Sequence, residues 1–306
     1  MLRGLQSMSK TERRRILSDY AFLTPQLVFY VAFTILPFFV SVPILFTDQN
    51  DFLDSTVHSI GLGNFRAIFS DTELQAEVVP ALVRTISFVL IHYLMIYVFG
   101  MTLALMMYEV GFRGELFTVI FLPMMVSGLA VGYLAILLFG KTIGSVNLIL
   151  LRLGWIQEAI DIKSAGGVTF ILPVLLGWRY AGYNMALFLS GLLSIPKETI
   201  EASIVDGASY IQRLFRVYFP QMLPTFVIAT IFCIIGSFMV FDELVALGAL
   251  VGNKDAEFLS VLLFTYAFGQ RRQLALGLTL AMVIGLPLVL FGVLGQRLQR
   301  RLQYEL

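Results

Sequence analysis

Residues 196–220 read PKETIEASIVDGASYIQRLFRVYFP, a polar stretch that separates two hydrophobic blocks. The pattern predicts two short amphipathic helices joined at Gly207, because Asp206-Gly207 offers a residue that tolerates a positive φ angle. Pro196 suits a first helical position, where its missing N–H costs nothing. We expect Pro220 to end the second helix, since proline interrupts helical hydrogen bonding. A polar helix pair in an apolar chain needs a surface outside the bilayer to receive it, which indicates a docking element.

The same stretch carries particular residues at fixed intervals. Glu201-Ala202-Ser203 is followed after three residues by Gly207 and, nine residues later, by Val217-Tyr218-Phe219-Pro220. This arrangement resembles the EAA motif of bacterial ABC importer permeases, in its sugar-permease version. Three positions, Ser203, Val217 and Phe219, depart from the usual pattern by mild changes of side-chain size.

In the family that this motif resembles, the two helices are coupling helices that sit in a groove of the ATPase subunit. The resemblance implies that the ATPase-coupling residues are Glu201, Ala202, Ser203, Asp206, Gly207, Ala208, Leu214 and Phe215. The alternative is an amphipathic hairpin that lies on the lipid surface. Such a hairpin needs no glycine and proline at fixed intervals, so we favour the coupling role.

The composition of the chain excludes an ordinary soluble domain. Of 306 residues, 58% are hydrophobic and 13% are charged, whereas the charged share of a soluble domain is about a quarter. The mean hydropathy is +0.86. The single cysteine, Cys233, excludes a disulfide framework and a thiolate metal site, and the net charge of +1 excludes a strongly basic nucleic-acid surface. We therefore predict a polytopic membrane protein.

Six apolar blocks are each long enough to cross about 30 Å of hydrocarbon. They are residues 22–46, 82–108, 116–139, 168–190, 226–247 and 274–294. The predicted fold is all-α, with six transmembrane helices and a cytoplasmic coupling loop, 191–223, between the fourth and the fifth. The predicted organisation is a cytoplasmic segment 1–21, a transmembrane permease domain 22–298 and a cytoplasmic tail 299–306.

The distribution of basic residues predicts the orientation of the spans. With the N-terminus inside, the segments on the cytoplasmic side hold twelve Lys or Arg, among them Arg3 and Arg113, and the outer loops hold seven. This bias follows the positive-inside rule and favours cytoplasmic N- and C-termini in a bacterial plasma membrane. It also places the loop 191–223 in the cytoplasm, where an ATPase would lie.

Polar residues in the second and fourth spans need a partner or a watery cavity. For His92 we favour a neutral histidine bonded to a neighbouring helix over a proton relay. Tyr180 and Asn184 lie one helical turn apart, and hydrogen-bonding and aromatic side chains together suit hydroxyl-rich ligands. The same two residues are also common as links between helices, so both roles stay open.

The fifth span carries a second set of candidates for the substrate pathway. Cys233, Ser237 and Phe241 repeat at four-residue spacing, and Asp242 follows toward the outer end. In the sugar permeases that this chain resembles, a Phe-Asp pair closes the corresponding helix and polar residues on this face line the cavity. Asp242 has an alternative role of nearly equal weight, an ion pair with a lysine or arginine of a partner subunit.

Two further patterns concern the third span and nucleotide binding. Gly128 and Gly132 form a G-x-x-x-G pattern that favours close helix packing in lipid, and Pro123 permits a bend. Gly140-Lys141-Thr142 is not a phosphate-binding loop, because Ala135 occupies the position that requires glycine. We therefore expect ATP and Mg²⁺ to be bound by a partner chain, and this chain to be no enzyme and to hold no cofactor or metal.

The resemblance covers residues 61–294, although residues 248–254 lack the Thr-x-Gly-Gly-Pro stretch that is common in the family. It implies the permease subunit of a bacterial ABC importer for a sugar or related polyol. The implied partners are a second permease subunit, an ABC ATPase dimer and an extracytoplasmic solute-binding protein, with no nucleic acid. The alternative is an ion-gradient-driven secondary transporter, which would show an internal repeat and a membrane-embedded carboxylate.

Overall fold

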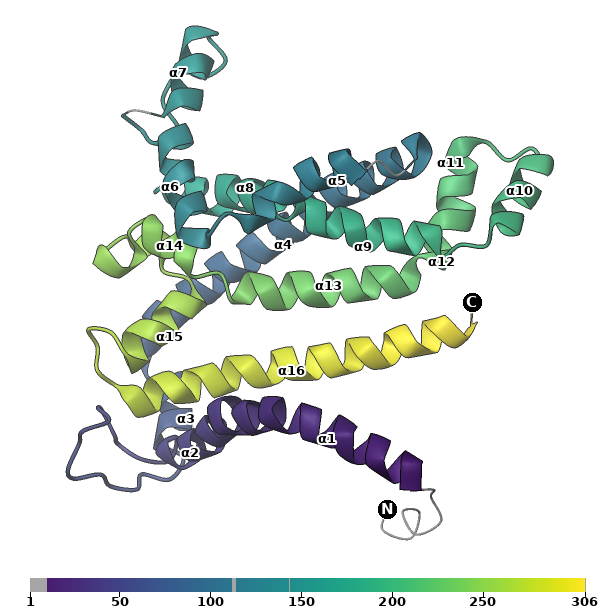
Figure 1. Cartoon of the computed structure of the whole chain (residues 1–306). Helices are drawn as coiled ribbons and strands as arrows, with labels where there is room; N and C mark the ends of the chain where they lie inside the picture. The colour runs from purple at the N-terminus through teal and green to yellow at the C-terminus, as the bar shows by residue number, and fades with distance from the viewer. Residues whose placement is uncertain (1–9, 112–113, 143, 306) are drawn as a thin grey trace.

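The computed structural model describes residues 10–111, 114–142 and 144–305, and this part of the chain is almost entirely helical (Figure 1). Its one β-type pairing is an isolated antiparallel bridge between Thr47 and Ser59. The prediction of an all-α fold is confirmed. Arg3 and Arg113, which entered the charge count, and the last residue of the expected tail lie outside the described residues.

The helices follow one another with short connections. The first half contains α1 (Lys10–Tyr30), the π-helical turn η2 (Val31–Ile35), α2 (Leu36–Ile44), α3 (Gly63–Ser70), α4 (Thr72–Val110), α5 (Gly114–Phe121), the 3₁₀ turn η3 (Leu122–Met125), α6 (Gly128–Phe139) and α7 (Ser145–Arg152). The second half contains η4 (Gly167–Ile171), α8 (Leu172–Arg179), α9 (Ala181–Leu193), α10 (Lys197–Val205), α11 (Tyr210–Arg213), η5 (Leu214–Tyr218), α12 (Phe219–Gln221), α13 (Leu223–Phe238), α14 (Asp242–Ala246), η6 (Ala249–Val251), η7 (Lys254–Ala256), α15 (Leu259–Ala267) and α16 (Leu274–Glu305).

Four helical segments in the described chain have the length and the apolar character of a membrane span. They are Ser18–Ile44, Thr72–Glu109, Leu223–Ala246 and Leu274–Gln303. A fifth is formed if Gly114–Met125 and Gly128–Phe139, which meet at 91°, are taken as one bent span. This bend follows Pro123, where the sequence permits one. The expected block 168–190 forms two shorter apolar helices, Gly167–Arg179 and Ala181–Leu193, rather than one continuous helix.

The expected start of the second span is wrong. α4 begins at Thr72, ten residues before the start of the expected span, because the Asp71 carboxylate accepts the N–H groups of Glu73 and Leu74 and caps the helix. Because this first turn is polar, a criterion based on hydropathy does not detect the true start of the helix. The fifth expected span, 226–247, corresponds to Leu223–Ala246, with an interruption between the end of α13 at Phe238 and the start of α14 at Asp242.

α4 is the central helix of the molecule. It packs against α8, α9 and α13, while α16 packs against α13 and α15. Phe88 of α4 and Phe188 of α9 are fully buried in the two largest clusters of apolar side chains. No residue of the first span, Ser18–Ile44, is buried within the chain. This span contacts the rest of the chain mainly where α2 meets α16.

The two ends of the helix stack differ in what they carry. The start of α1, the end of α16 and the α10–α11 hairpin lie at one end of the molecule (Figure 1). α7, α14 and the segment that leads into α15 lie at the other end. The hairpin and both termini of the described chain therefore share one side.

The G-x-x-x-G pattern brings α6 against α14. A Cβ atom added at Gly132 would lie 2.5 Å from the Ala246 Cβ and 2.8 Å from the Glu243 backbone oxygen, and one added at Gly128 would lie 2.8 Å from the Asp242 Cβ. Only glycine permits this approach, so the predicted packing role of the pattern is confirmed. The contact also fixes where α14 begins.

Candidate functional site

The hairpin of α10, α11 and η5 is built from local signals. Gly207 connects the helices with φ at +76°, a conformation that glycine adopts without strain, as predicted. The second helix starts with a capping box: the Gln212 N–H donates to the Ser209 Oγ, and the Ser209 N–H donates to the Gln212 Oε1 at 2.8 Å. These contacts lie within the stretch itself, so the turn forms without help from distant parts of the chain.

The expectation that Pro220 ends the second helix is wrong. Helical turns continue from Leu214–Tyr218 into Phe219–Gln221, and Pro220 lies in the first turn of α12, where no N–H is required. The end comes at Met222, from which α13 departs. The hairpin is consequently joined to α13 by an almost continuous helical connection.

One side of the hairpin faces the helix stack. Tyr218 is buried and its ring meets the Tyr108 ring edge-on, with centroids 6.1 Å apart. Leu214 packs against the same cluster of buried side chains. Burial raises the pKa of Tyr210 and Tyr218, and the nearby Glu109 carboxylate adds to the rise at both, so both phenols are neutral at physiological pH.

The other side of the hairpin presents apolar side chains to solvent. Val205 is 86% exposed and Ile211 67%, with Ile204 and Phe215 also exposed. We call these four residues the hairpin patch. Among the residues expected from the motif, Glu201, Ala202, Asp206, Gly207 and Phe215 are exposed, while Ser203, Ala208 and Leu214 are half-buried. The Ser203 hydroxyl donates to the Ile200 carbonyl at 2.6 Å, inside its own helix.

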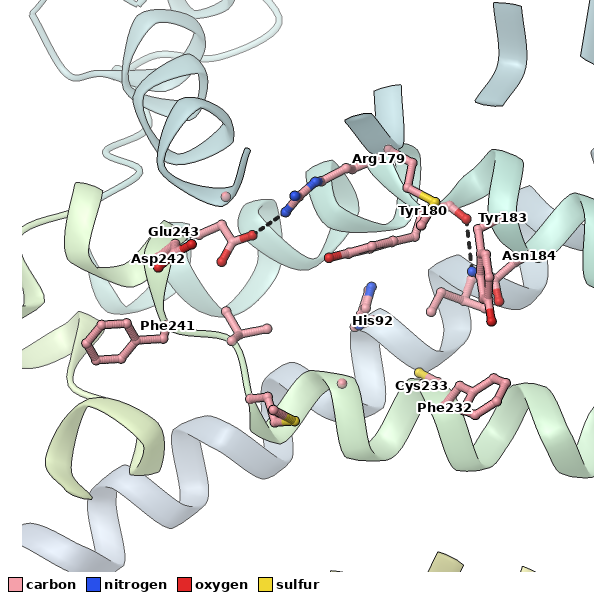
Figure 2. A pocket seen from close by; sticks show the side chains of 16 residues that line it. His92, Arg179, Tyr180, Tyr183, Asn184, Phe232, Cys233, Phe241, Asp242 and Glu243 are labelled. Atoms are coloured by element: carbon pink, nitrogen blue, oxygen red, sulfur yellow. Dashed lines mark hydrogen bonds and ion pairs between the residues drawn. The ribbon is translucent and has the colours of Figure 1, made fainter. Parts of the chain in front are cut away.

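A cavity of about 550 Å³ lies between α4, the junction of α8 and α9, α13 and α14 (Figure 2). Five of the six candidate pathway residues line it: Tyr180, Asn184, Cys233, Phe241 and Asp242. The structure thus brings together residues from two expected spans that are some 50 positions apart. Ser237 does not line the cavity.

Ser237 lies behind the cavity wall and holds a histidine in place. Its hydroxyl donates to the Cys233 carbonyl at 2.6 Å, so its oxygen accepts from the Nδ1–H of His92, 2.8 Å away. This bond from α4 to α13 is the helix-to-helix link predicted for His92. The same histidine lines the cavity, and its Nε2 has no hydrogen-bond partner among the described residues.

The junction of α8 and α9 shapes the cavity wall. The helix is interrupted at Tyr180, whose carbonyl accepts both the Asn184 backbone N–H at 3.0 Å and the Asn184 side-chain amide at 2.9 Å. The Arg179 guanidinium lies 5.0 Å from the centre of the Tyr180 ring. Tyr183 and Phe232 add two further rings to the lining, neither of which was among the sequence candidates.

A buried ion pair that we did not predict joins the two sides of the cavity. Arg179 Nη1 donates to Glu243 Oε1 at 2.6 Å, and the two side chains are 11% and 7% exposed (Figure 2). Charges buried this deeply require a partner, so the presence of Arg179 within an apolar span was the signal that could have revealed the pair. Asp242, the acid that the sequence suggested for an ion pair, has no such partner in the described part of the chain.

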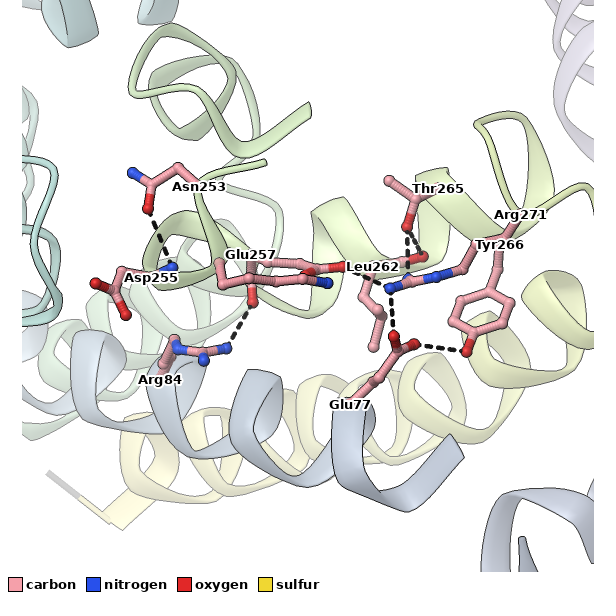
Figure 3. A network of polar contacts seen from close by, with 10 residues as sticks. Glu77, Arg84, Asn253, Asp255, Glu257, Leu262, Thr265, Tyr266 and Arg271 are labelled. Atoms are coloured by element: carbon pink, nitrogen blue, oxygen red, sulfur yellow. Dashed lines mark hydrogen bonds and ion pairs between the residues drawn. The ribbon is translucent and has the colours of Figure 1, made fainter. Parts of the chain in front are cut away.

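A separate polar network braces the opposite end of the molecule from the hairpin (Figure 3). Arg271 Nη2 lies 2.7 Å from a carboxylate oxygen of Glu77 and 3.1 Å from one of Glu257. The Tyr266 hydroxyl also donates to Glu77, and Arg84 donates to the Glu257 backbone carbonyl at 3.2 Å. These contacts fasten the loop before and after α15 to the first third of α4.

In the described residues, no group of three or more His, Cys, Asp or Glu side chains is placed to hold a metal ion. The cavity lining is instead suited to hydrogen bonding and ring stacking, with tyrosine hydroxyls, an amide and a histidine beside apolar rings.

Comparison with known proteins gives one family and a consistent set of relatives. Residues 96–304 match the model of the family described as "Binding-protein-dependent transport system inner membrane component". The arabinooligosaccharides transport system permease protein AraP of Halalkalibacterium halodurans is 30% identical, over 73% of this chain and 69% of that protein. The multiple sugar-binding transport system permease protein MsmF of Streptococcus mutans is 27% identical, over 90% of this chain and 96% of that protein.

The fold is also found in a solved structure. A chain of a bacterial alginate ABC transporter, crystallised in complex with an alginate pentasaccharide-bound periplasmic protein, superposes with a TM-score of 0.77. The match covers 95% of this chain and 96% of that chain at 19% sequence identity. At this identity the likeness concerns the fold.

Proposed function

This chain belongs to the binding-protein-dependent transport system inner membrane component family, as a permease subunit of an ABC importer, and we propose that it carries a saccharide across the bacterial plasma membrane. It does so together with a second permease subunit, a dimer of ABC ATPase subunits that bind ATP and Mg²⁺, and an extracytoplasmic solute-binding protein. The family match supports this function over an ion-gradient-driven transporter.

The hairpin patch carries the proposal for ATPase coupling. Ile204, Val205, Ile211 and Phe215 expose apolar surface on a segment that also carries the motif residues Glu201 to Gly207. Contiguous exposed apolar side chains beside polar ones are typical of protein interfaces. Its position, between α9 and the helical connection to α13, suits an element that receives movement from a partner and passes it to two membrane helices.

For the topology we propose six crossings with both termini in the cytoplasm. The bent pair of α5 and α6 counts as one crossing, and α8 with α9 counts as another. This arrangement is supported by the position of the hairpin, which lies on the same side of the molecule as both ends of the described chain (Figure 1). In it, residues 191–223 follow the fourth crossing and face the ATPase, while the network around Arg271 faces the binding protein.

The transport cycle follows from this arrangement. ATP closes the ATPase dimer, the hairpins of the two permease subunits move with it, and the attached helices change between inward-facing and outward-facing states. ATP thereby shifts the population of a two-state element. The cavity between α4, α8 and α13 holds the saccharide during this change, and the binding protein supplies most of the selectivity.

Saccharides suit the cavity by chemistry. The rings of Tyr180, Tyr183 and Phe232 offer flat surfaces for the apolar faces of sugar rings, and Asn184 and the two tyrosine hydroxyls offer hydrogen-bonding groups for sugar hydroxyls. Relatives named for arabino-oligosaccharides and for multiple sugars support the same class.

The experiment is to purify the chain with its partner subunits, reconstitute the complex in proteoliposomes, and measure ATP-dependent uptake of arabinotriose, maltotriose and raffinose with the binding protein present. Glu201→Lys is expected to abolish substrate-stimulated ATPase activity while the chain remains in the membrane. Thr199→Lys, which adds a cation to the roughly opposite face of the same helix, serves as the matched control.

Three outcomes would contradict the proposal. Normal uptake by Glu201→Lys would remove the hairpin from the coupling pathway. Uptake by the purified chain alone, driven by a proton or sodium gradient, would favour the secondary transporter. Uptake of none of the three saccharides by a complex whose ATPase is active would reject the substrate class.

A further inference from the structure

The cavity lining contains more negative than positive charge. Its charged side chains are one cation, Arg179, and two carboxylates, Asp242 and Glu243. Arg179 and Glu243 are bonded to each other at 2.6 Å and both are buried, so their charges largely cancel for a ligand in the cavity. The remaining unbalanced charge belongs to Asp242.

The Asp242 carboxylate is free to act on a ligand. The residue is exposed, and no hydrogen bond or ion pair holds its side chain within the described residues. It lies at the start of α14, next to Glu243 and on the cavity lining (Figure 2). The close approach of Gly128, where an added Cβ would lie 2.8 Å from the Asp242 Cβ, fixes the position of this residue.

The other polar atoms of the lining suit hydroxyl groups. Tyr180 and Tyr183 line the cavity and are only partly buried, and a phenol hydroxyl can both donate to and accept from a ligand hydroxyl. A carboxylate accepts one or two hydroxyl hydrogens in charge-assisted bonds. The same carboxylate repels an anionic ligand, and repulsion between like charges in a cleft is strong because the surrounding protein screens it poorly.

We propose that Asp242 is a specificity-determining residue that makes this cavity select uncharged saccharides and exclude those bearing carboxylates or phosphates. The inference rests on the proposed function, since it concerns the same cavity, and it narrows the substrate class within it. A fixed charge gives specificity by weakening the binding of anionic ligands rather than by strengthening the binding of neutral ones.

The charge of the cavity can be measured without knowing the substrate, because the chain contains one cysteine. In the complete transporter, Cys233→Ser removes this thiol, and Met239→Cys places a new one on the lining at a position that is 72% exposed. The variant with both substitutions is the reporter, and it is treated with a cationic and an anionic methanethiosulfonate of similar size. Each rate is normalised to that of a free thiol in solution, and labelling is followed by the mass of this chain.

The cationic reagent is expected to react about tenfold faster than the anionic one, because one fixed negative charge a few ångströms away attracts the first and repels the second. Asp242→Asn should bring the ratio close to one, and Asp242→Glu should preserve it. Glu158→Gln, which removes an exposed carboxylate of an outer loop, is the matched control and should leave the ratio unchanged. A ratio at or below one in the reporter, or a ratio that Asp242→Asn does not alter, would overturn the proposal.

Uptake provides the second measurement. For a neutral trisaccharide that the complex transports, the rate is compared with that of trigalacturonate in the wild type and in Asp242→Asn. The substitution should reduce the preference for the neutral sugar about tenfold. If the labelling ratio behaves as expected but no saccharide is transported, the proposed function fails while the charge of the cavity stands. An unchanged preference would remove Asp242 as the determinant.

Discussion

The hairpin at residues 196–220 and the cavity at Arg179 and Asp242 are both polar regions of an apolar chain, yet they are built differently. The hairpin is a run of 25 consecutive residues whose turn and cap are closed by bonds within the run. The cavity is closed by residues as far apart as His92 and Glu243, and by an ion pair across 64 positions. The region that we propose contacts the ATPase is therefore specified locally, whereas the region that we propose binds the substrate depends on packing.

The largest effect is expected at the turn of the hairpin. Gly207→Pro fixes φ near −65° where the chain requires +76°, so the two hairpin helices cannot keep their relative orientation. We expect uptake to fall more than about a hundredfold, while thermal stability of the membrane helices changes little. The measurement is ATP-driven uptake together with the melting temperature of the purified complex.

Gly207→Asn is the matched control, because asparagine tolerates a positive φ and no atom lies within 4 Å of the position where its Cβ would stand. It should retain most of the uptake. A large loss of melting temperature in Gly207→Pro would show that the hairpin is not the independent local unit described above, and so would break the contrast between the two regions.

For the ion pair at the cavity we expect a large loss of stability, in contrast to the small change expected at the hairpin turn. Arg179→Ala leaves the buried Glu243 carboxylate without its partner and should destabilise the protein by about 3–5 kcal/mol, which denaturation of the purified complex would measure. The double variant Arg179→Met with Glu243→Leu removes both charges and should regain most of this stability. If the single and double variants are equally unstable, the pair is not what joins the two sides of the cavity.

A smaller effect is expected where α6 meets α14. Gly132→Ala places a methyl group 2.5 Å from the Ala246 Cβ and should cost about 1–3 kcal/mol of stability through overpacking. Gly285→Ala, in a spanning helix with no atom within 4 Å of the new methyl group, should be neutral or slightly stabilising. Equal stability of the two variants would indicate that α14 is free to move, and that the position of Asp242 is less fixed than its contacts indicate.

The comparison also explains which features could be predicted. The hairpin and its glycine turn depend on residues within a few positions of one another, and both were found where the sequence indicated. For the G-x-x-x-G pattern the sequence indicated that a helix packs closely there, but not that the partner is α14. Five of the six pathway candidates meet at one cavity, but the four-residue repeat of the fifth span predicted its lining only in part: Cys233 and Phe241 line the cavity, whereas Ser237 does not.

The remaining features depend on which helices and side chains pack against one another, and a hydropathy profile carries no information about this packing. Ser237 shares its face with Cys233 but bonds to His92 and so lies behind the lining. The pair of Arg179 with Glu243 joins residues 64 positions apart, on two different helices, and no local pattern in the sequence indicates it. The early start of α4 was missed because Asp71 and the polar first turn stabilise the helix without making it hydrophobic.

The length of α4 has a mechanical consequence. With 39 residues it measures about 58 Å, close to twice the thickness of a hydrocarbon layer of about 30 Å. Its first third is held by contacts of Glu77 and Arg84, and near its C-terminal end Tyr108 contacts the hairpin. A rigid rod of this size that pivots by about 10° at mid-bilayer sweeps each tip through an arc of about 5 Å. If the hairpin is the coupling element that we propose, a small tilt of α4 at its Tyr108 end would displace the Glu77 end by a similar distance, with no need for the helix to slide or unwind.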